Sequence, residues 1–226
     1  AGFKLKAMLK NSEFKFYAAM IAGFTLFIML ELIFRCNYEV EHAFRSSAFQ
    51  VVSFITTTGL FSDDAAKWPH VTWVVLAACM FFGGSSGSTS GGIKSIRGVM
   101  LVKVIKNEFR QILHPNAVLP MKVDGYNVQM CKRVTLLAFI GLYLFLAVIC
   151  AFTMIAAGID STNSMTITLS SLGNVGPTLG LEIGPTMSWN ELPDFAKWIS
   201  SFLMLVGRLE LFSVLVLFTP SFWKEN

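Results

Sequence analysis

The chain has 226 residues, of which 54% are hydrophobic and 14% charged, and its mean hydropathy is +0.61. In soluble domains about a quarter of the residues are charged, so this composition excludes a disordered chain and argues against a water-soluble one. The formal charge is +4, but no basic patch is interleaved with aromatic residues, so we expect no nucleic-acid partner. The cysteines lack metal-binding spacing and are expected to be inert packing thiols; they are Cys36, Cys79, Cys131 and Cys150.

Three apolar stretches are long enough to cross a hydrocarbon core of about 30 Å as helices. They are residues 14–34, residues 134–159 and residues 195–218, and the second has no charged residue in 26 positions. A fourth apolar block, residues 71–82, is too short to cross. It runs into residues 83–92, which comprise five glycines, four serines and one threonine. We therefore expect a spanning helix that is broken inside the membrane.

Basic residues indicate the orientation of these segments. Of the 18 basic residues, 13 lie before or at the start of the first stretch, between the fourth block and Val134, or at the chain end. Cytoplasmic connections are enriched in Lys and Arg, so both ends of the chain are expected inside. Residues 111–132 are interpreted as a cytoplasmic linker whose basic face meets membrane lipid headgroups.

Each outward connection contains a short apolar segment that leads into a glycine-containing turn. Residues 43–55 precede TTTGL, and residues 162–172 precede GNVGP. Segments of 11 to 13 residues are typical of re-entrant helices. Placing Gly59 on Gly176 gives an offset of 117 residues. The order of elements then repeats, which predicts an internal duplication.

The two turns suit a filter made of backbone carbonyls. Such carbonyls replace the water shell of a potassium ion, and glycine allows backbone dihedrals that a side chain would forbid. An ordinary outer-face turn is an equal alternative for one copy, whereas two equivalent copies favour a filter. The expected potassium-binding residues are Thr57, Thr58, Gly59, Asn174, Val175 and Gly176.

Four motifs carry a resemblance to a known family. They are TTTGL at 56–60, GGSSGSTSGGIKSIR at 83–97, SLGNVGP at 171–177 and GRLELFSVLVLFTPSFW at 207–223. The chain resembles the C-terminal half of a TrkH-type subunit of the Trk/Ktr/HKT potassium transporter superfamily. It begins with Ala and shows no leader, so we expect a piece of a longer protein.

The resemblance implies an all-α polytopic membrane protein with two helix/pore-loop/helix repeats of a pseudo-fourfold, potassium-channel-like pore. The third repeat would comprise residues 1–110, with a broken second helix, and the fourth residues 133–226. It also implies potassium uptake across the bacterial inner membrane, a homodimer, and a TrkA-type nucleotide-binding regulatory subunit in the cytoplasm. Both visible filter positions are glycine, which in this superfamily accompanies potassium over sodium, although the first repeat is missing.

The glycine-rich segment corresponds to an intramembrane gate in the resembling family. Lys94 and Arg97 would anchor its cytoplasmic end. A nucleotide-binding turn is disfavoured, since Ile93 separates Gly92 from the lysine. Gate residues carried over by resemblance are Gly83, Gly84, Gly87, Gly91, Gly92 and Arg208.

The three long apolar stretches contain five charged residues, which are Lys15, Glu31, Lys197, Arg208 and Glu210, and two of them are candidates for function. Arg208 is near mid-membrane, where a charge indicates a functional position, and the resemblance places it in the pore near the gate. Its alternative is an ion pair within the bundle. Glu31 is either functional or an interfacial residue paired with Arg35, one turn later.

Two other classes of function remain to be weighed. A secondary transporter with an organic substrate at a broken helix is the main alternative. An enzyme is disfavoured, because no cluster of His, Asp, Glu or Cys lies in the spans, so neither covalent chemistry nor an organic cofactor is expected. The sequence leaves open whether transport is passive or coupled to protons or sodium.

Overall fold

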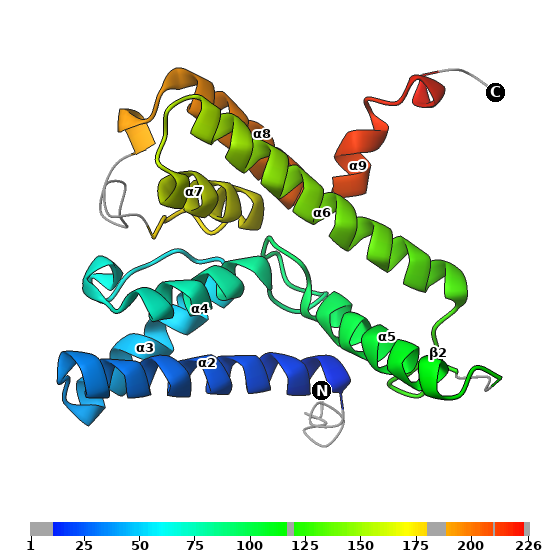
Figure 1. Cartoon of the computed structure of the whole chain (residues 1–226), viewed down its shortest axis with the longest axis horizontal. Coiled ribbons are helices and arrows are strands. Elements are labelled where there is room, and N and C mark those ends of the chain that lie inside the picture. The colour runs from blue at the N-terminus through cyan, green and yellow to red at the C-terminus, as the bar shows by residue number, and fades with distance from the viewer. Residues whose placement is uncertain (1–10, 117–119, 180–188, 210, 224–226) are drawn as a thin grey trace, which may run out of the picture.

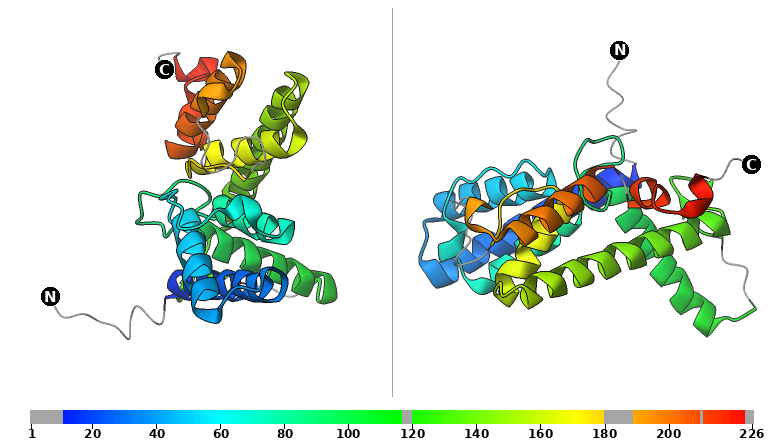
Figure 2. Two further views of the ribbon diagram at one scale, coloured as in Figure 1. Left: turned by 90° about the vertical axis from the view of Figure 1, so that its left-hand side faces the viewer. Right: turned by 90° about the horizontal axis from the view of Figure 1, so that it is seen from above.

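The computed structural model describes residues 11–116, 120–179, 189–209 and 211–223, which form helices with one short hairpin. Figure 1 shows two groups of helices, with α2, α3 and α4 on one side and α6, α7 and α8 on the other. In the left-hand view of Figure 2, α7 and the glycine-rich segment lie between α2 and the α8 and α9 helices. The architecture is therefore all-α, as expected.

The first group opens with α2, Ser12–Cys36. Asn11 caps this helix, because its side-chain oxygen accepts the amide protons of Glu13 and Phe14 at 2.7 and 3.2 Å. The helix ends where Asn37 adopts a left-handed conformation. The other elements are α3 (Val40–Ile55), η1 (Ala65–Lys67), α4 (His70–Phe81) and α5 (Ser95–Leu113).

The second group repeats this order with α6, Met130–Ala156, and α7, Ser161–Gly173. Asp160 caps α7 by accepting the amide proton of Thr162 at 2.9 Å. The remaining elements are η2 (Trp189–Glu191), α8 (Asp194–Arg208), α9 (Leu211–Val216) and η3 (Pro220–Phe222).

Two of these helices have the dimensions of membrane spans. Helices α2 and α6 have 25 and 27 residues, and each contains a strongly apolar window. Many of their large apolar side chains are exposed, including Phe34 and Phe145, as expected for surfaces that face lipid. The helices expected at residues 14–34 and 134–159 are thus confirmed, although α6 ends three residues early.

The last apolar stretch, residues 195–218, is not one spanning helix, so that expectation is wrong. Helix α8 ends at Arg208, and α9 starts at Leu211 and turns away (Figure 1). Gly207 packs against the Leu172 carbonyl so closely that a β-carbon there would lie 2.0 Å from that oxygen. At the offset of 117 residues, Leu211 at the start of α9 corresponds to Lys94, one residue before α5 begins, whereas α8 continues ten residues beyond the position equivalent to Phe81. The second long helix is therefore interrupted in both groups and resumes at nearly equivalent positions.

The core of each group contains side chains that belong to a turn of the other group. Helix α2 packs on α3, and α7 packs on both α6 and α8. Val175 and Leu179, which follow α7, are buried in the core formed by α2, α3 and α4. Conversely, Ile93 is buried in the core of α6, α8 and α9. Each group therefore fixes the position of a turn that belongs to the other.

The expected linker, residues 111–132, is shorter in the structure and contains an unpredicted hairpin. Helix α5 extends to Leu113, and α6 begins at Met130. Strands β1 (Lys122–Val123) and β2 (Tyr126–Asn127) pair in antiparallel fashion. Asp124 and Gly125 lie between the strands, and both have positive φ. Asp-Gly is a usual sequence for a two-residue hairpin turn, which requires this conformation.

Candidate functional site

The turns that follow α3 and α7 have the same backbone conformation. Thr57 and Asn174 adopt left-handed dihedrals, with φ of 56° and 54°. Gly59 and Gly176, two positions further on, also have positive φ, of 72° and 106°. Positive φ is uncommon for residues other than glycine, so its occurrence at matching positions supports the duplication inferred from the sequence.

Equivalent hydrogen bonds close the two turns. The Ser53 carbonyl accepts the amide proton of Thr58 at 2.9 Å, and the Ser170 carbonyl accepts that of Val175 at 3.0 Å. These bonds satisfy carbonyls that a helix end otherwise leaves unpaired. The turns are thus built by their own helices in the same way.

The hydroxyl groups of the same two serines hold the backbone beyond each turn. The Ser53 hydroxyl accepts the Leu60 amide proton at 2.8 Å and donates to the Leu60 carbonyl at 2.7 Å. The Ser170 hydroxyl accepts the Gly176 amide proton at 3.1 Å. Both serines are buried, so little water competes for these bonds. The extended backbone after each turn is therefore fixed.

The two turns touch each other. A β-carbon on Gly59 would lie 2.2 Å from the Val175 carbonyl oxygen and 2.9 Å from the Pro177 Cδ atom. Only glycine fits at this contact, because its φ is also positive. Gly59 and Val175, which are 116 positions apart and were expected to share one site, are thus in contact.

The glycine-rich segment between α4 and α5 is a closed loop rather than a loose connection. At its base, Gly83 donates its amide proton to the Ile93 carbonyl at 2.9 Å, and Ile93 donates to Phe81 at 3.0 Å. The Ser95 amide and hydroxyl donate to the carbonyls of Gly84 and Gly83 at 3.1 and 2.9 Å. These bonds satisfy backbone groups that the broken helix would leave unpaired.

The far side of this segment lies against both turns. The Gly91 amide donates to the Thr57 hydroxyl at 3.3 Å. A β-carbon on Gly91 would lie 2.2 Å from the Gly173 carbonyl oxygen. Gly87, by contrast, is exposed, and a β-carbon there would meet no described atom within 4 Å. The expected gate residues therefore differ in position, since Gly91 lies against the two turns and Gly87 does not.

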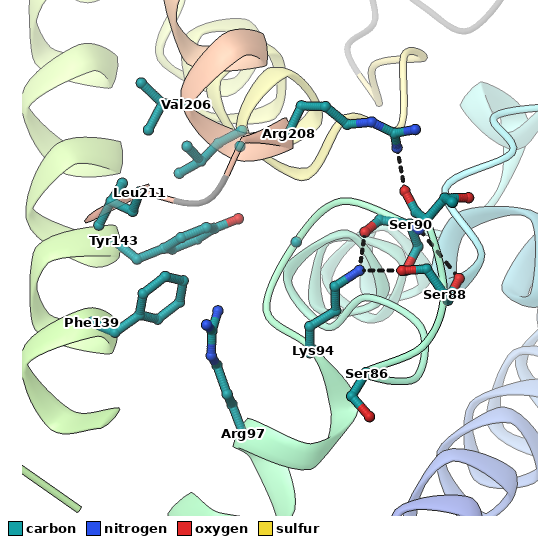
Figure 3. Close-up of a pocket in the computed structure, with 14 residues that line it drawn as sticks. Ser86, Ser88, Ser90, Lys94, Arg97, Phe139, Tyr143, Val206, Arg208 and Leu211 are labelled. Atoms are coloured by element: carbon teal, nitrogen blue, oxygen red, sulfur yellow. Dashed lines mark hydrogen bonds between the residues drawn. The ribbon is translucent and has the colours of Figure 1, made fainter. Parts of the chain in front are cut away.

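Two cationic side chains hold the carbonyls of the segment (Figure 3). Arg208 donates a hydrogen bond to the Thr89 carbonyl. The Lys94 ammonium donates to the carbonyl of Ser88 at 2.8 Å and contacts that of Ser90. Arg208 was expected near this segment, and it makes a direct contact there.

A carboxylate that sequence reasoning missed holds the other side of the segment. Glu13, in the first turn of α2, accepts the Ser86 amide proton at 2.6 Å and the Ser86 hydroxyl proton at 3.0 Å. The two residues are 73 positions apart, and no sequence pattern links them. Opposite charges from α2 and α8 thus contact the same loop.

The other charged residues singled out in the sequence lie beside these contacts or away from them. The Arg97 guanidinium lies over the Phe139 ring, 3.9 Å from its centroid, which is a cation–π geometry. Glu31 pairs with Arg35 at 2.8 Å, as the interfacial interpretation predicts. Glu210 is outside the described residues.

The family model for TrkH, described as a cation transport protein, matches residues 13–225. The chain belongs to the TrkH family of cation transport proteins. It is 33% identical to the Trk system potassium uptake protein TrkH of Halomonas elongata over 98% of its length, and 35% identical to that of Escherichia coli K12 over 100%.

The fold of this TrkH-family chain is also similar to a solved structure. The crystal structure of the potassium transporter TrkH from Vibrio parahaemolyticus matches 97% of the chain with a TM-score of 0.90 and 33% sequence identity. The chain spans 45 to 46% of the length of these relatives. The family resemblance drawn from the four sequence motifs is therefore confirmed.

Proposed function

We propose that this chain forms half of a potassium uptake pore, as the third and fourth repeats of a pseudo-fourfold assembly. The observation that carries the proposal is the contact between two equivalent turns, where Gly59 meets the Val175 carbonyl. The named function of the relatives, potassium uptake, supports potassium as the transported ion.

Selectivity would come from the backbone of the two turns. Carbonyl groups on turns whose following backbone is fixed by buried serines can replace the water shell of an ion without rearranging. The residues that would contribute are Thr57, Thr58, Gly59, Asn174, Val175 and Gly176. The glycines favour potassium over sodium, with the first two repeats completing the ring.

The glycine-rich segment would act as the gate below this filter. Its contact with Thr57 and Gly173 places it directly against both turns. Its closed base and its contacts with Glu13, Lys94 and Arg208 favour one defined position over a flexible one. A positive charge on Arg208 would also repel a cation at this point. Displacement of the segment would then open the path.

The whole protein would be a multi-pass protein of the bacterial inner membrane. We infer cytoplasmic ends for this chain from its basic connections. A homodimer and a TrkA-type regulatory subunit complete the proposed assembly. Residues 1–110 and 133–226 would be its third and fourth repeats, joined by a cytoplasmic linker at 111–132.

The full-length parent protein in liposomes tests this function. Uptake of potassium down a gradient should exceed uptake of sodium, and organic solutes such as amino acids should neither be taken up nor compete. Empty liposomes provide the control. Uptake of an organic solute without potassium flux would favour a secondary transporter and overturn the proposal.

A further inference from the structure

A polar cavity of about 340 Å³ lies beside the glycine-rich segment, between it and helix α6. Its walls include three cationic side chains, those of Lys94, Arg97 and Arg208, together with hydroxyl groups of the glycine-rich segment. One carboxylate among the described residues belongs to the same region, that of Glu13, through its contact with Ser86. Counting it against the three cations leaves a formal charge of +2 among the described residues. The cavity is therefore unsuited to the transported cation, which its walls would repel.

A second observation points to a ligand in this cavity. Tyr143 is 2% exposed, and its hydroxyl has no hydrogen-bond partner among the described residues. Figure 3 shows this hydroxyl and the Arg97 guanidinium pointing into the space between α6 and the segment. A buried hydroxyl without a partner is unfavourable, and an acceptor in the cavity would satisfy it.

We propose that this cavity binds a phosphate group. Phosphate oxygens accept hydrogen bonds from hydroxyl groups and pair with guanidinium groups in a planar, two-pronged geometry. A guanidinium has five N–H donors, and the Thr89 carbonyl accepts one of those on Arg208. The cavity volume suits a single phosphate with part of its substituent.

The neighbouring surface favours a phospholipid as the source of the phosphate. A second groove of about 330 Å³, between α5 and α6, shares Arg97 and Phe139 with the cavity. It adds the apolar side chains of Ile96, Met100 and Leu136. A headgroup in the cavity could therefore continue into an acyl chain along the groove, whereas free phosphate would use the cavity alone.

Lipid binding to the purified full-length parent tests the proposal, with native mass spectrometry of phosphatidylglycerol and phosphatidylcholine adducts as the readout. The variants are Tyr143→Phe, which removes only the hydroxyl, and Arg97→Gln. Loss of a hydrogen bond to a charged group should weaken phosphatidylglycerol binding about tenfold. Arg110→Gln removes a matched charge from the exposed end of the same helix and should leave binding unchanged.

A second arm distinguishes the source of the phosphate. Inorganic phosphate is titrated against chloride at equal ionic strength, and the thermal midpoint is followed for the same variants. If phosphate raises the thermal midpoint and both Tyr143→Phe and Arg97→Gln abolish this rise, the result supports free phosphate as the ligand. If the same two variants weaken phosphatidylglycerol binding, the result supports a lipid. If neither probe depends on Tyr143 and Arg97, the site does not exist. Both readouts are independent of transport, so either result leaves the proposed pore to its own test.

Discussion

Gly91 packs directly on the carbonyl of Gly173, and a β-carbon at position 91 would lie 2.2 Å from that oxygen. This contact joins the glycine-rich segment to the last residue of α7 and so to the turn that begins at Asn174. The two elements that we assign to gating and selectivity are therefore in contact at a backbone carbonyl, which cannot move aside as the end of a flexible side chain could.

Substitution of Gly91 should separate these elements. We expect Gly91→Ala to destabilise the full-length protein by about 1–3 kcal/mol, because the β-carbon meets a carbonyl that only a backbone shift can move. Gly87→Ala is the matched control in the same segment, since nothing lies within 4 Å and its effect should stay within about 0.5 kcal/mol. Thermal unfolding in detergent measures both. Equal midpoints would contradict the contact.

The two filter glycines should differ in their sensitivity. Gly59→Ala introduces a clash with the Val175 carbonyl in addition to backbone strain, whereas Gly176→Ala introduces strain alone, because a β-carbon there meets no atom of the described residues within 4 Å. We therefore expect a larger loss of potassium over sodium selectivity for Gly59→Ala. Flux ratios in liposomes measure the difference, and a greater effect at Gly176 would argue against the observed contact between the turns.

Removal of the Arg208 side chain should raise ion flux. Arg208→Ala deletes both the hydrogen bond to Thr89 and a positive charge next to the segment. Lys197→Ala is the control on the same helix, since its ammonium pairs only with the exposed Asp194 among the described residues. Flux through the full-length protein should increase for Arg208→Ala alone. Unchanged flux, with normal expression, would remove Arg208 from the gate.

Glu13 should restrain the opposite side of the segment. Glu13→Gln weakens two hydrogen bonds from Ser86, so amide exchange at Ser86 should accelerate by about tenfold. Glu41→Gln, at an exposed pair with Arg45, should leave that exchange rate unchanged. Hydrogen exchange followed by mass spectrometry resolves the segment. Equal exchange in both variants would show that Glu13 does not hold it.

The hydrogen bond from the Ser12 amide to the Asp124 carboxylate, in the turn of the hairpin, should depend on pH. Hydrogen bonds from Ser12 lower the pKa of Asp124 from its ordinary value of 3.8, with smaller contributions from Lys103 and Lys15. Because the folded pKa is the lower one, the stabilisation is complete well above pH 3.8 and is lost as the pH falls through the folded value. Exchange at the Ser12 amide should therefore be protected at pH 7 relative to Asp124→Asn. Equal protection in the two proteins would exclude the contact.

The sequence predicts most of the helices, because the bilayer requires a long apolar run for each spanning helix whatever contacts that helix makes in the folded protein. Helices α2 and α6 coincide with two of the long apolar stretches, and the two turns follow from glycine and the repeat. The hairpin was also predictable, since Asp124 and Gly125 form a standard turn sequence.

Features that depend on contacts between distant residues could not be predicted. The stretch from 195 to 218 is mostly apolar, and nothing in it shows that Gly207 must admit the Leu172 carbonyl. The contact of Glu13 with Ser86 joins two distant segments without a motif. Arg208 was identified because a charge inside an apolar helix is conspicuous, whereas Glu13 lies at a helix start where acidic residues are common.

The most direct test of the proposed pore is ion uptake by a potassium-transport-deficient bacterium that expresses the full-length parent gene, with and without Gly59→Ser, and a supplied regulatory subunit. We expect potassium-selective rescue by the parent and reduced selectivity for potassium over sodium in the variant. Absence of rescue despite confirmed membrane expression, or rescue with unchanged selectivity in the variant, would contradict a filter at this turn.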